Sequence, residues 1–161
     1  MQADHLTRPL AVVALPSPLD QGARFPRATW PAHVTLASNF AVDASAAQVT
    51  ETVREVVAGL NPMAVSFEGA GMFGPNGDIP VQLICSPAIS HVHERLAEAL
   101  ERLPRFEPEQ PAYWRAGFRP HMTHVADRDT PEGAQTVLGY VAIAVIDGEH
   151  AIIVDRFSLT P

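Results

Sequence analysis

PAHVTL, at residues 31–36, returns in altered form as RPHMTHV, at residues 119–125. Both copies hold a His-x-Thr triplet with an apolar middle residue, and a proline shortly before each triplet suits a strand start and opposes a helix. Side chains two apart on a strand point to the same face, so each triplet presents an imidazole and a hydroxyl together. The chain is therefore predicted to carry half of an acid–base site on each of two strands.

The spacing of the two triplets suggests how they are used. His33 and His121 are 121 − 33 = 88 positions apart, enough chain for each to belong to its own half of a two-lobed structure. In a chain with seven histidines the bare triplet is weak evidence, and the shared proline and apolar context carries the inference. Two facing histidines could then act on one substrate.

Composition describes a folded chain with a real core. The 161 residues are 47% hydrophobic, and no apolar run approaches the roughly 20 residues that span a bilayer. The start, Met1 to His5, lacks the pattern of a signal peptide, so we expect a cytoplasmic protein with no membrane partner. The single cysteine, Cys85, lies in an apolar run and is expected to be a small buried residue rather than a nucleophile.

Charge limits the class of partner. Eleven basic against eighteen acidic residues give a formal net charge of −7, which opposes long-range attraction to a nucleic acid backbone. Five arginines nevertheless precede the two triplets closely enough to create local positive potential: Arg24, Arg27, Arg105, Arg115 and Arg119. A short nucleotide end fits this balance better than long duplex RNA.

Hydrophobic patterning predicts alternating strands and helices without the regular rhythm or glycine-rich turn of a dinucleotide fold. We expect a strand at 10–15, a loop at 17–30, a helix from Ser45 to about Leu60, a hairpin of 63–73 with 79–85, a helix capped by Ser86 or Ser90 that runs to 103, and extended segments at 151–159. The segment from Thr130 to about Ile146 is ambiguous, and we assign a helix. These elements favour an α+β fold with helices backing antiparallel sheets.

At this point the chain resembles the 2H phosphoesterase superfamily, which includes bacterial 2′-5′ RNA ligase-like proteins and cyclic nucleotide phosphodiesterases. The likeness rests on RPLAVVALP at 8–16, EGAGMF at 68–73 and FRPHMT at 118–123, in that order, and covers about residues 8–160. It implies one bilobal domain over residues 1–161, with two pseudo-symmetric lobes of antiparallel sheet around a central cleft, and neither a metal nor another cofactor.

The resemblance also implies the roles of the site residues. His33 and His121 become general acid and base, and Thr35 and Thr123 hold phosphate oxygens. Two imidazoles with unperturbed pKa values of about 6.5 can occupy opposite protonation states near neutral pH, which concerted proton transfer requires. Which of the two is the acid stays open.

Further residues are candidates for substrate contact. Arg119 shares the predicted strand face of His121 and is placed to meet a phosphate, and Phe73, beside the glycine-rich turn, is placed to form a cleft wall. Tyr113 and Trp114 either stack a base or, as is more usual, pack over the core.

One residue departs from the family pattern. His124 stands where the family is usually apolar, on the opposite strand face from His121.

Three rival interpretations compete with hydrolysis. A metal site would need His121 with His124, or His91 with His93, and both pairs diverge on the predicted elements. A binding protein could keep the fold and hold a phosphorylated nucleotide-like ligand without turnover, and a 2′-5′ RNA end-joining ligase would run the reverse reaction. We expect a monomeric hydrolase that opens a 2′,3′-cyclic phosphate or a 2′-5′ phosphodiester of a small nucleotide or RNA end.

Overall fold

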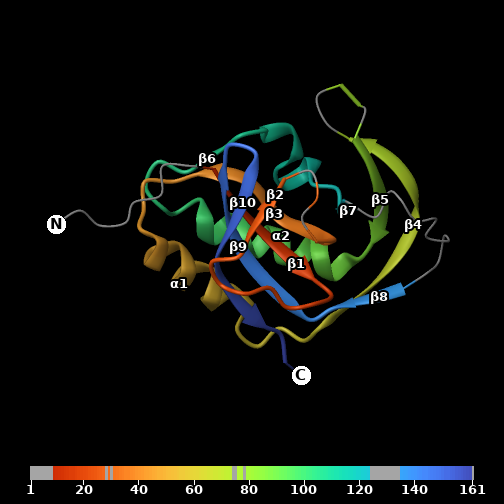
Figure 1. Ribbon diagram of the computed structural model, residues 1–161, viewed down its shortest axis with the longest axis horizontal. Coiled ribbons are helices and arrows are strands. Elements are labelled where there is room, and N and C mark those ends of the chain that lie inside the picture. Colours follow the sequence, from red (N-terminus) through yellow and green to blue (C-terminus); the bar gives the residue numbers. More distant parts are fainter. Residues whose placement is uncertain are drawn as a thin grey trace.

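The computed structural model describes residues 9–27, 29, 31–73, 76–77, 79–123 and 135–160 (Figure 1). The strands are β1 (Leu10–Leu15), β2 (Arg24–Pro26), β3 (His33–Ala41), β4 (Met63–Phe73), β5 (Ile79–Cys85), β6 (Glu107–Pro108), β7 (His121–Thr123), β8 (Gln135–Leu138), β9 (Tyr140–Asp147) and β10 (His150–Ser158). The helices are α1 (Ala46–Val57), α2 (Pro87–Leu100) and two 3₁₀ turns, η1 (Pro111–Tyr113) and η2 (Arg115–Gly117).

The described strands form one ten-stranded sheet in the order β2-β10-β9-β1-β3-β7-β5-β4-β8, with β6 paired to β3 off this path. All of the pairings among these strands are antiparallel. Strands β3 and β7 meet at the centre, so β10-β9-β1-β3 and β7-β5-β4-β8 make two matching halves on either side of that junction. In Figure 1, β4 and β5 curve along the right-hand side, away from β9 and β10. The predicted α+β fold with two lobes is confirmed.

Both long helices begin where their capping residues predict. In α1 the Ser45 hydroxyl accepts from the Gln48 amide, and the Gln48 side chain accepts from the Ser45 amide, which is a capping box. In α2 the Ser86 hydroxyl accepts from the Ile89 amide, and Pro87 occupies the first turn, so Ser86 rather than Ser90 is the cap. Neither helix is long and apolar enough to cross a membrane.

The sheet buries apolar side chains on both faces of its first half. One face packs on the helices, with Val12, Val34 and Ile143 beside Val53 and Leu96 in a single buried cluster. On the other face Val13, Leu15, Ala142, Ala144 and Ile153 form a second cluster, covered by Leu19, Ala23 and Phe25 from the segment that leads through β2. The two clusters together hold β1 and β9 at the centre of this half.

The helix predicted from Thr130 to Ile146 is wrong where the structure describes it. Residues 135–138 and 140–147 are strands β8 and β9, separated by Gly139, and residues 130–134 lie outside the described part. Strand β9 is buried on both faces, with Val141, Ile143 and Val145 in one cluster and Ala142, Ala144 and Ile146 in the other. A strand buried on both sides loses the alternation that identifies a strand, and this loss made the segment ambiguous.

Cys85 is exposed, so the expectation that it is buried is also wrong. It ends β5, where Ile84 packs on the helix-backed core and the neighbouring positions Leu83 and Cys85 face the other way. On that same face of β5, Val81 is 4% exposed and Leu83 is half-buried, so burial decreases along the strand toward Cys85. Cys85 is therefore exposed because it lies at the end of the strand, beyond the buried part of this face.

Candidate active site

The two His-x-Thr triplets lie next to each other on the central strands of the sheet. Strands β3 and β7 pair with His33 opposite Thr123 and Val34 opposite Met122, and the same register extended by one residue sets Thr35 opposite His121. Directly opposed residues of an antiparallel pair occupy the same face. Positions 33, 35, 121 and 123 therefore form one square on one face of the sheet.

The other face of the same two strands anchors them. Val34 is fully buried and Met122 is 3% exposed, and both belong to the core under the helices. A slip of one residue in either strand would exchange these apolar side chains with the imidazoles. Core packing therefore fixes which face carries the site.

The strands flanking the triplets repeat a second, weaker motif that sequence analysis missed. Val13 on β1 lies opposite Thr35, and Val81 on β5 lies opposite Thr123. Leu83 lies opposite His121, and the β1 register, with Ala14 opposite Val34, sets Leu15 beside His33. The signal was VAL at 13–15 and VQL at 81–83, a Val-x-Leu pair too common to notice without knowing which strands are neighbours.

Each histidine is held by the same backbone contact. The His33 Nδ1 lies 2.7 Å from the Pro31 carbonyl oxygen, and the His121 Nδ1 lies 2.9 Å from the Arg119 carbonyl oxygen. A carbonyl oxygen only accepts, so Nδ1 carries the proton in both rings, and Nε2 is the nitrogen that can gain or lose one. The prolines near each triplet thus shape a loop whose carbonyl, two residues before the histidine, orients the ring.

The electrostatic setting of His121 favours its neutral form. Burial lowers its pKa below the ordinary value of 6.5, the hydrogen bond to the Arg119 carbonyl acts in the opposite direction, and the positive charge of Arg119 lowers it further. His33 is only 3% exposed, whereas His121 is half-buried. The two rings therefore occupy related but unequal surroundings.

The remaining predicted site residues fall into two groups. Thr35 is half-buried on β3, and Arg119 is exposed just before β7, close enough for its charge to act on His121. The side chains of Phe73 and Thr123, and His124 altogether, lie outside the described part of the chain.

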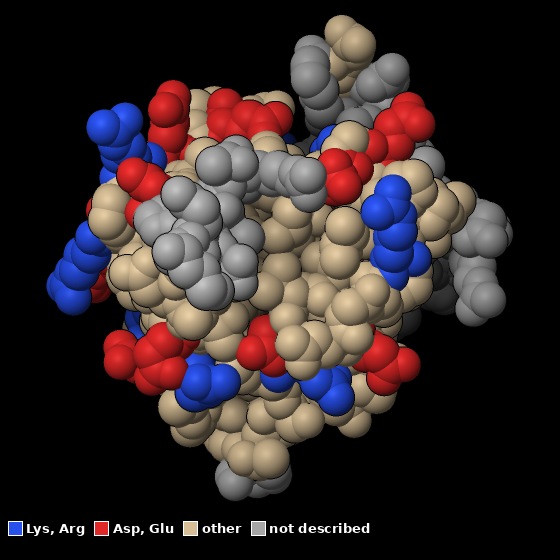
Figure 2. Space-filling model, turned by 60° about the vertical axis from the view of Figure 1, so that its left-hand side comes forward, with Lys and Arg blue, Asp and Glu red and all other residues tan. Residues whose placement is uncertain are grey.

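Other arginines near the triplets are occupied elsewhere. Arg115 pairs with Glu94 at 3.0 Å and with Glu101 at 2.8 Å. Two looser contacts of 4.0 Å join Arg24 to Asp147 and Arg105 to Asp43. The face in Figure 2 shows basic and acidic side chains interspersed around a broad uncharged area. Arg119 is the arginine whose charge bears on His121.

The aromatic and histidine candidates outside the triplets are mostly structural. Trp114 is buried and packs on Phe40 and Phe106, as expected for core packing, while Tyr113 is 39% exposed. His91 is exposed and His93 is buried, so the pair diverges on α2 as predicted. Within the described residues, no three His, Cys, Asp or Glu side chains cluster in a way that could hold a metal ion.

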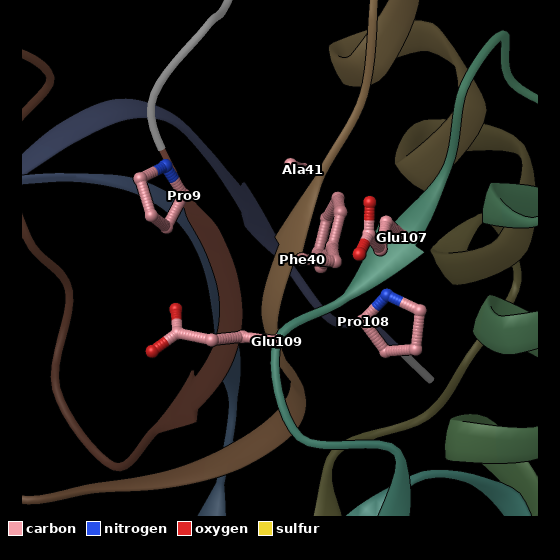
Figure 3. A pocket seen from close by; sticks show the side chains of 6 residues that line it. All are labelled: Pro9, Phe40, Ala41, Glu107, Pro108 and Glu109. Atoms are coloured by element: carbon pink, nitrogen blue, oxygen red, sulfur yellow. The ribbon is translucent and has the colours of Figure 1, made fainter.

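A pocket of about 310 Å³ lies at the far end of β3 from the triplet (Figure 3). Pro9 and Glu109 stand on one side of it, and Glu107 and Pro108 on the other, with Phe40 between them. Phe40 is seven residues along β3 from His33, roughly 20 Å at strand rise. This pocket is therefore separate from the two triplets.

The chain matches one protein family over nearly its whole length. The model of the 2′-5′ RNA ligase superfamily matches residues 7–159. A protein of Bacillus pumilus (strain SAFR-032) named "Putative phosphoesterase" is 32% identical over 132 residues, which cover 80% of this chain and 70% of that protein.

Solved structures share the fold at lower identity. Escherichia coli LigT complexed with 3′-AMP superposes with a TM-score of 0.58 at 16% identity, covering 96% of this chain and 99% of that one. The protein TT0787 of Thermus thermophilus gives a TM-score of 0.57 at 15% identity, with coverage of 94% and 97%. Both agree with this chain in fold over nearly their whole length.

Proposed function

The chain belongs to the 2′-5′ RNA ligase superfamily, and from that premise we propose that it is a metal-independent phosphodiesterase acting on a 2′,3′-cyclic phosphate or a 2′-5′ phosphodiester. The observation that carries the proposal is the pair of identically tethered histidines. Each donates Nδ1–H to the carbonyl two residues earlier, and the two stand on adjacent strands of one sheet face.

Hydrolysis needs one group to remove a proton from water and another to supply a proton to the leaving ribose oxygen. The neutral imidazole accepts the first proton at Nε2 as the water oxygen bonds to phosphorus. The protonated imidazole gives up its Nε2 proton as the bond from phosphorus to the ribose oxygen breaks. The two imidazoles finish with exchanged protonation states, and proton exchange with solvent restores them.

The polar groups around the histidines suit a phosphate in transit. Thr35 and Thr123 supply hydroxyl donors for the nonbridging oxygens, whose charge grows as a fifth oxygen approaches phosphorus. Arg119 supplies a positive charge beside His121. All of these groups are the chain's own, so the proposed reaction uses no cofactor.

The proposed substrate is a small nucleotide or the end of an RNA. The net charge of −7 disfavours a long nucleic acid groove, and the fold relative LigT has been solved with 3′-AMP, ATP and NADP⁺. Those ligands are all nucleotides, which supports a site sized for a nucleotide in this chain as well.

The test is hydrolysis of the four 2′,3′-cyclic nucleotides and a 2′-5′-linked dinucleotide in EDTA, by the native protein and by His33→Ala and His121→Ala. We expect turnover that resists EDTA and falls at least about 100-fold in either variant. The control is His91→Ala, which removes an exposed histidine on α2 and should leave the rate unchanged. Nucleotide binding without turnover would replace the proposal with a binding protein, and full activity in both triplet variants would refute the two-histidine mechanism.

A further inference from the structure

His93 lies on α2, outside the two triplets, and is 1% exposed. Both of its ring nitrogens bond to backbone atoms far away in the sequence. Nδ1 lies 2.8 Å from the Leu36 carbonyl oxygen, and Nε2 accepts the Arg115 amide at 2.9 Å. Because the carbonyl only accepts and the amide only donates, the neutral ring with its proton on Nδ1 satisfies both contacts.

These two backbone groups lead directly to the two triplets. Leu36 follows Thr35 on β3, so the first contact holds the strand of His33. Arg115 is the first residue of η2, and after Gly117 the chain continues through Phe118 to Arg119, whose carbonyl oxygen orients His121. One imidazole therefore joins, from the helix side, the two segments that carry the site.

Aromatic packing also holds the His93 ring in place. Phe118 stacks on it with centroids 3.9 Å apart and an interplanar angle of 2°, and Trp114 meets its edge at 5.0 Å. The Trp114 indole N–H donates to Glu101, which also binds the Arg115 guanidinium. Arg115 itself adopts a φ of 61°, a left-handed conformation that a side chain other than glycine needs outside contacts to hold.

We propose that His93 is a positioning residue that sets the geometry of His33 relative to His121. It does so by bonding to the backbone of two segments, called the two arms below: strand β3 with His33, and residues 115–121 with His121. The proposal rests on the proposed function, because it assigns His93 a role in that same reaction. A misplacement of about 1 Å can cost a proton-transfer site as much as 100-fold in rate. A single buried contact between the arms is thus a sensitive place to control catalysis without touching substrate.

Three substitutions separate the parts of this contact. His93→Asn keeps an amide donor near Nδ1 for Leu36, and His93→Gln keeps an acceptor near Nε2 for the Arg115 amide. His93→Phe keeps a ring against Phe118 and removes both bonds. The matched control is Val92→Ala, which opens the same buried stretch of α2 but contacts neither arm through a hydrogen bond.

Two readouts are combined, steady-state kinetics and the ¹⁵N shifts of the His33 and His121 rings. We expect His93→Phe to lower kcat about tenfold or more with KM within about twofold, and to mix the tautomers of His121. Asn and Gln should fall between it and the native protein, and Val92→Ala should lose thermal stability without either effect. If His93→Phe does not fold, the Asn and Gln variants carry the same comparison.

One outcome would overturn the proposal for His93. If kcat in every His93 variant falls only in proportion to the loss in Tm, as in Val92→Ala, and the His121 shifts stay native, His93 is only a core residue. A native protein without turnover would refute the proposed function instead. The ring shifts, which need no substrate, would then decide by themselves whether His93 positions the two histidines.

Discussion

At the scale of single residues, the site depends on which nitrogen of each imidazole faces the reaction. The Pro31 and Arg119 carbonyls hold the Nδ1 protons of His33 and His121, and this leaves Nε2 for chemistry in both rings. The triplets themselves could be read from sequence, because strand periodicity alone puts His and Thr on one face. The carbonyl contacts could not, because a loop conformation two residues upstream has no side-chain signature.

The lowered pKa of His121 predicts a pH-dependent signal. We expect its ring to titrate below pH 6.5 by NMR, because burial penalises the charged form. Arg119→Gln should move the midpoint upward, since it removes a positive charge that disfavours protonation. Arg105→Gln, an exposed arginine that contacts Asp43, is the control and should leave the midpoint in place. A native midpoint at or above 6.5 would contradict the prediction.

The lowered pKa of His121 favours its neutral form, which can accept a proton but cannot donate one from Nε2. We therefore propose that His121 acts as the base in hydrolysis, which leaves His33 as the acid. A nucleotide p-nitrophenyl ester, whose leaving group needs no proton, should then restore much of the rate to His33→Ala and little to His121→Ala. Rescue of the His121 variant instead would reverse the assignment.

Thr35 offers a test of phosphate contact by its hydroxyl alone. Thr35→Val keeps the shape and removes the donor, and we expect kcat to fall about 10- to 100-fold, somewhat less than the loss of a full oxyanion-hole donor. Thr35→Ser should retain most of the rate. Thr136→Val on β8, also half-buried on a strand, is the matched control. Equal kinetics for Thr35→Val and the native protein would remove Thr35 from the site.

At the scale of elements, the segment from η1 to β7 joins the core to the second triplet. A Cβ on Gly117 would lie 1.7 Å from the Ala112 carbonyl oxygen, so η2 closes against η1 only with glycine there. We expect Gly117→Ala to displace this segment, to cost about 1–3 kcal/mol of stability, and to lower kcat as well. Gly139→Ala, where a Cβ meets nothing within 4 Å, is the control for thermal melting and kinetics. Native behaviour of Gly117→Ala would show that the close approach is not required.

Elements with a strong period or cap were predictable, and those shaped by their neighbours were not. Ser45 and Ser86 predict the starts of their helices, because a capping hydroxyl accepts a hydrogen bond from a backbone N–H only three residues later. The sequence predicts a helix where strand β9 forms, because its apolar residues on both faces reflect the two layers that cover it and show no strand alternation. Leu19, Ala23 and Phe25, which cover β1 and β9, lie in a segment that carries no periodic signal.

At the scale of the whole molecule, the two lobes followed from the resemblance and the register did not. The spacing of 88 residues allowed two halves, whereas the pairing of β3 directly with β7 required the complete sheet order. Once that order is known, Val13 and Val81 occupy equivalent positions, one opposite Thr35 and the other opposite Thr123. The central junction is therefore where the two halves share both their sheet and their proposed chemistry.

Buried histidines link the stability of the whole fold to pH. Burial lowers the pKa of both His93 and His121 in the folded state. Below pH 6.5 the unfolded chain therefore binds more protons than the folded one, and the free energy of unfolding should decrease as pH falls toward the folded pKa values. Each such histidine contributes at most about 1.4 kcal/mol per pH unit. Urea unfolding of the native protein and His93→Gln between pH 7.5 and 5 should show the smaller slope in the variant, and equal slopes would contradict this linkage.

The overall charge predicts how the length of an RNA affects turnover. Because the net charge is −7 and Arg115 is already paired to Glu94 and Glu101, we expect the protein to neutralise few phosphates beyond the scissile one. For a single strand, the logarithm of affinity falls with the logarithm of salt by about 0.7 per phosphate neutralised. We expect a mononucleotide 2′,3′-cyclic phosphate and a 20-nucleotide RNA with the same end to have kcat/KM values within about threefold, each with a shallow salt slope of about one or less. A long RNA that is favoured more than tenfold at low salt, and loses this advantage steeply as salt rises, would reveal a basic track along the protein and move the natural substrate from nucleotide ends to long RNA.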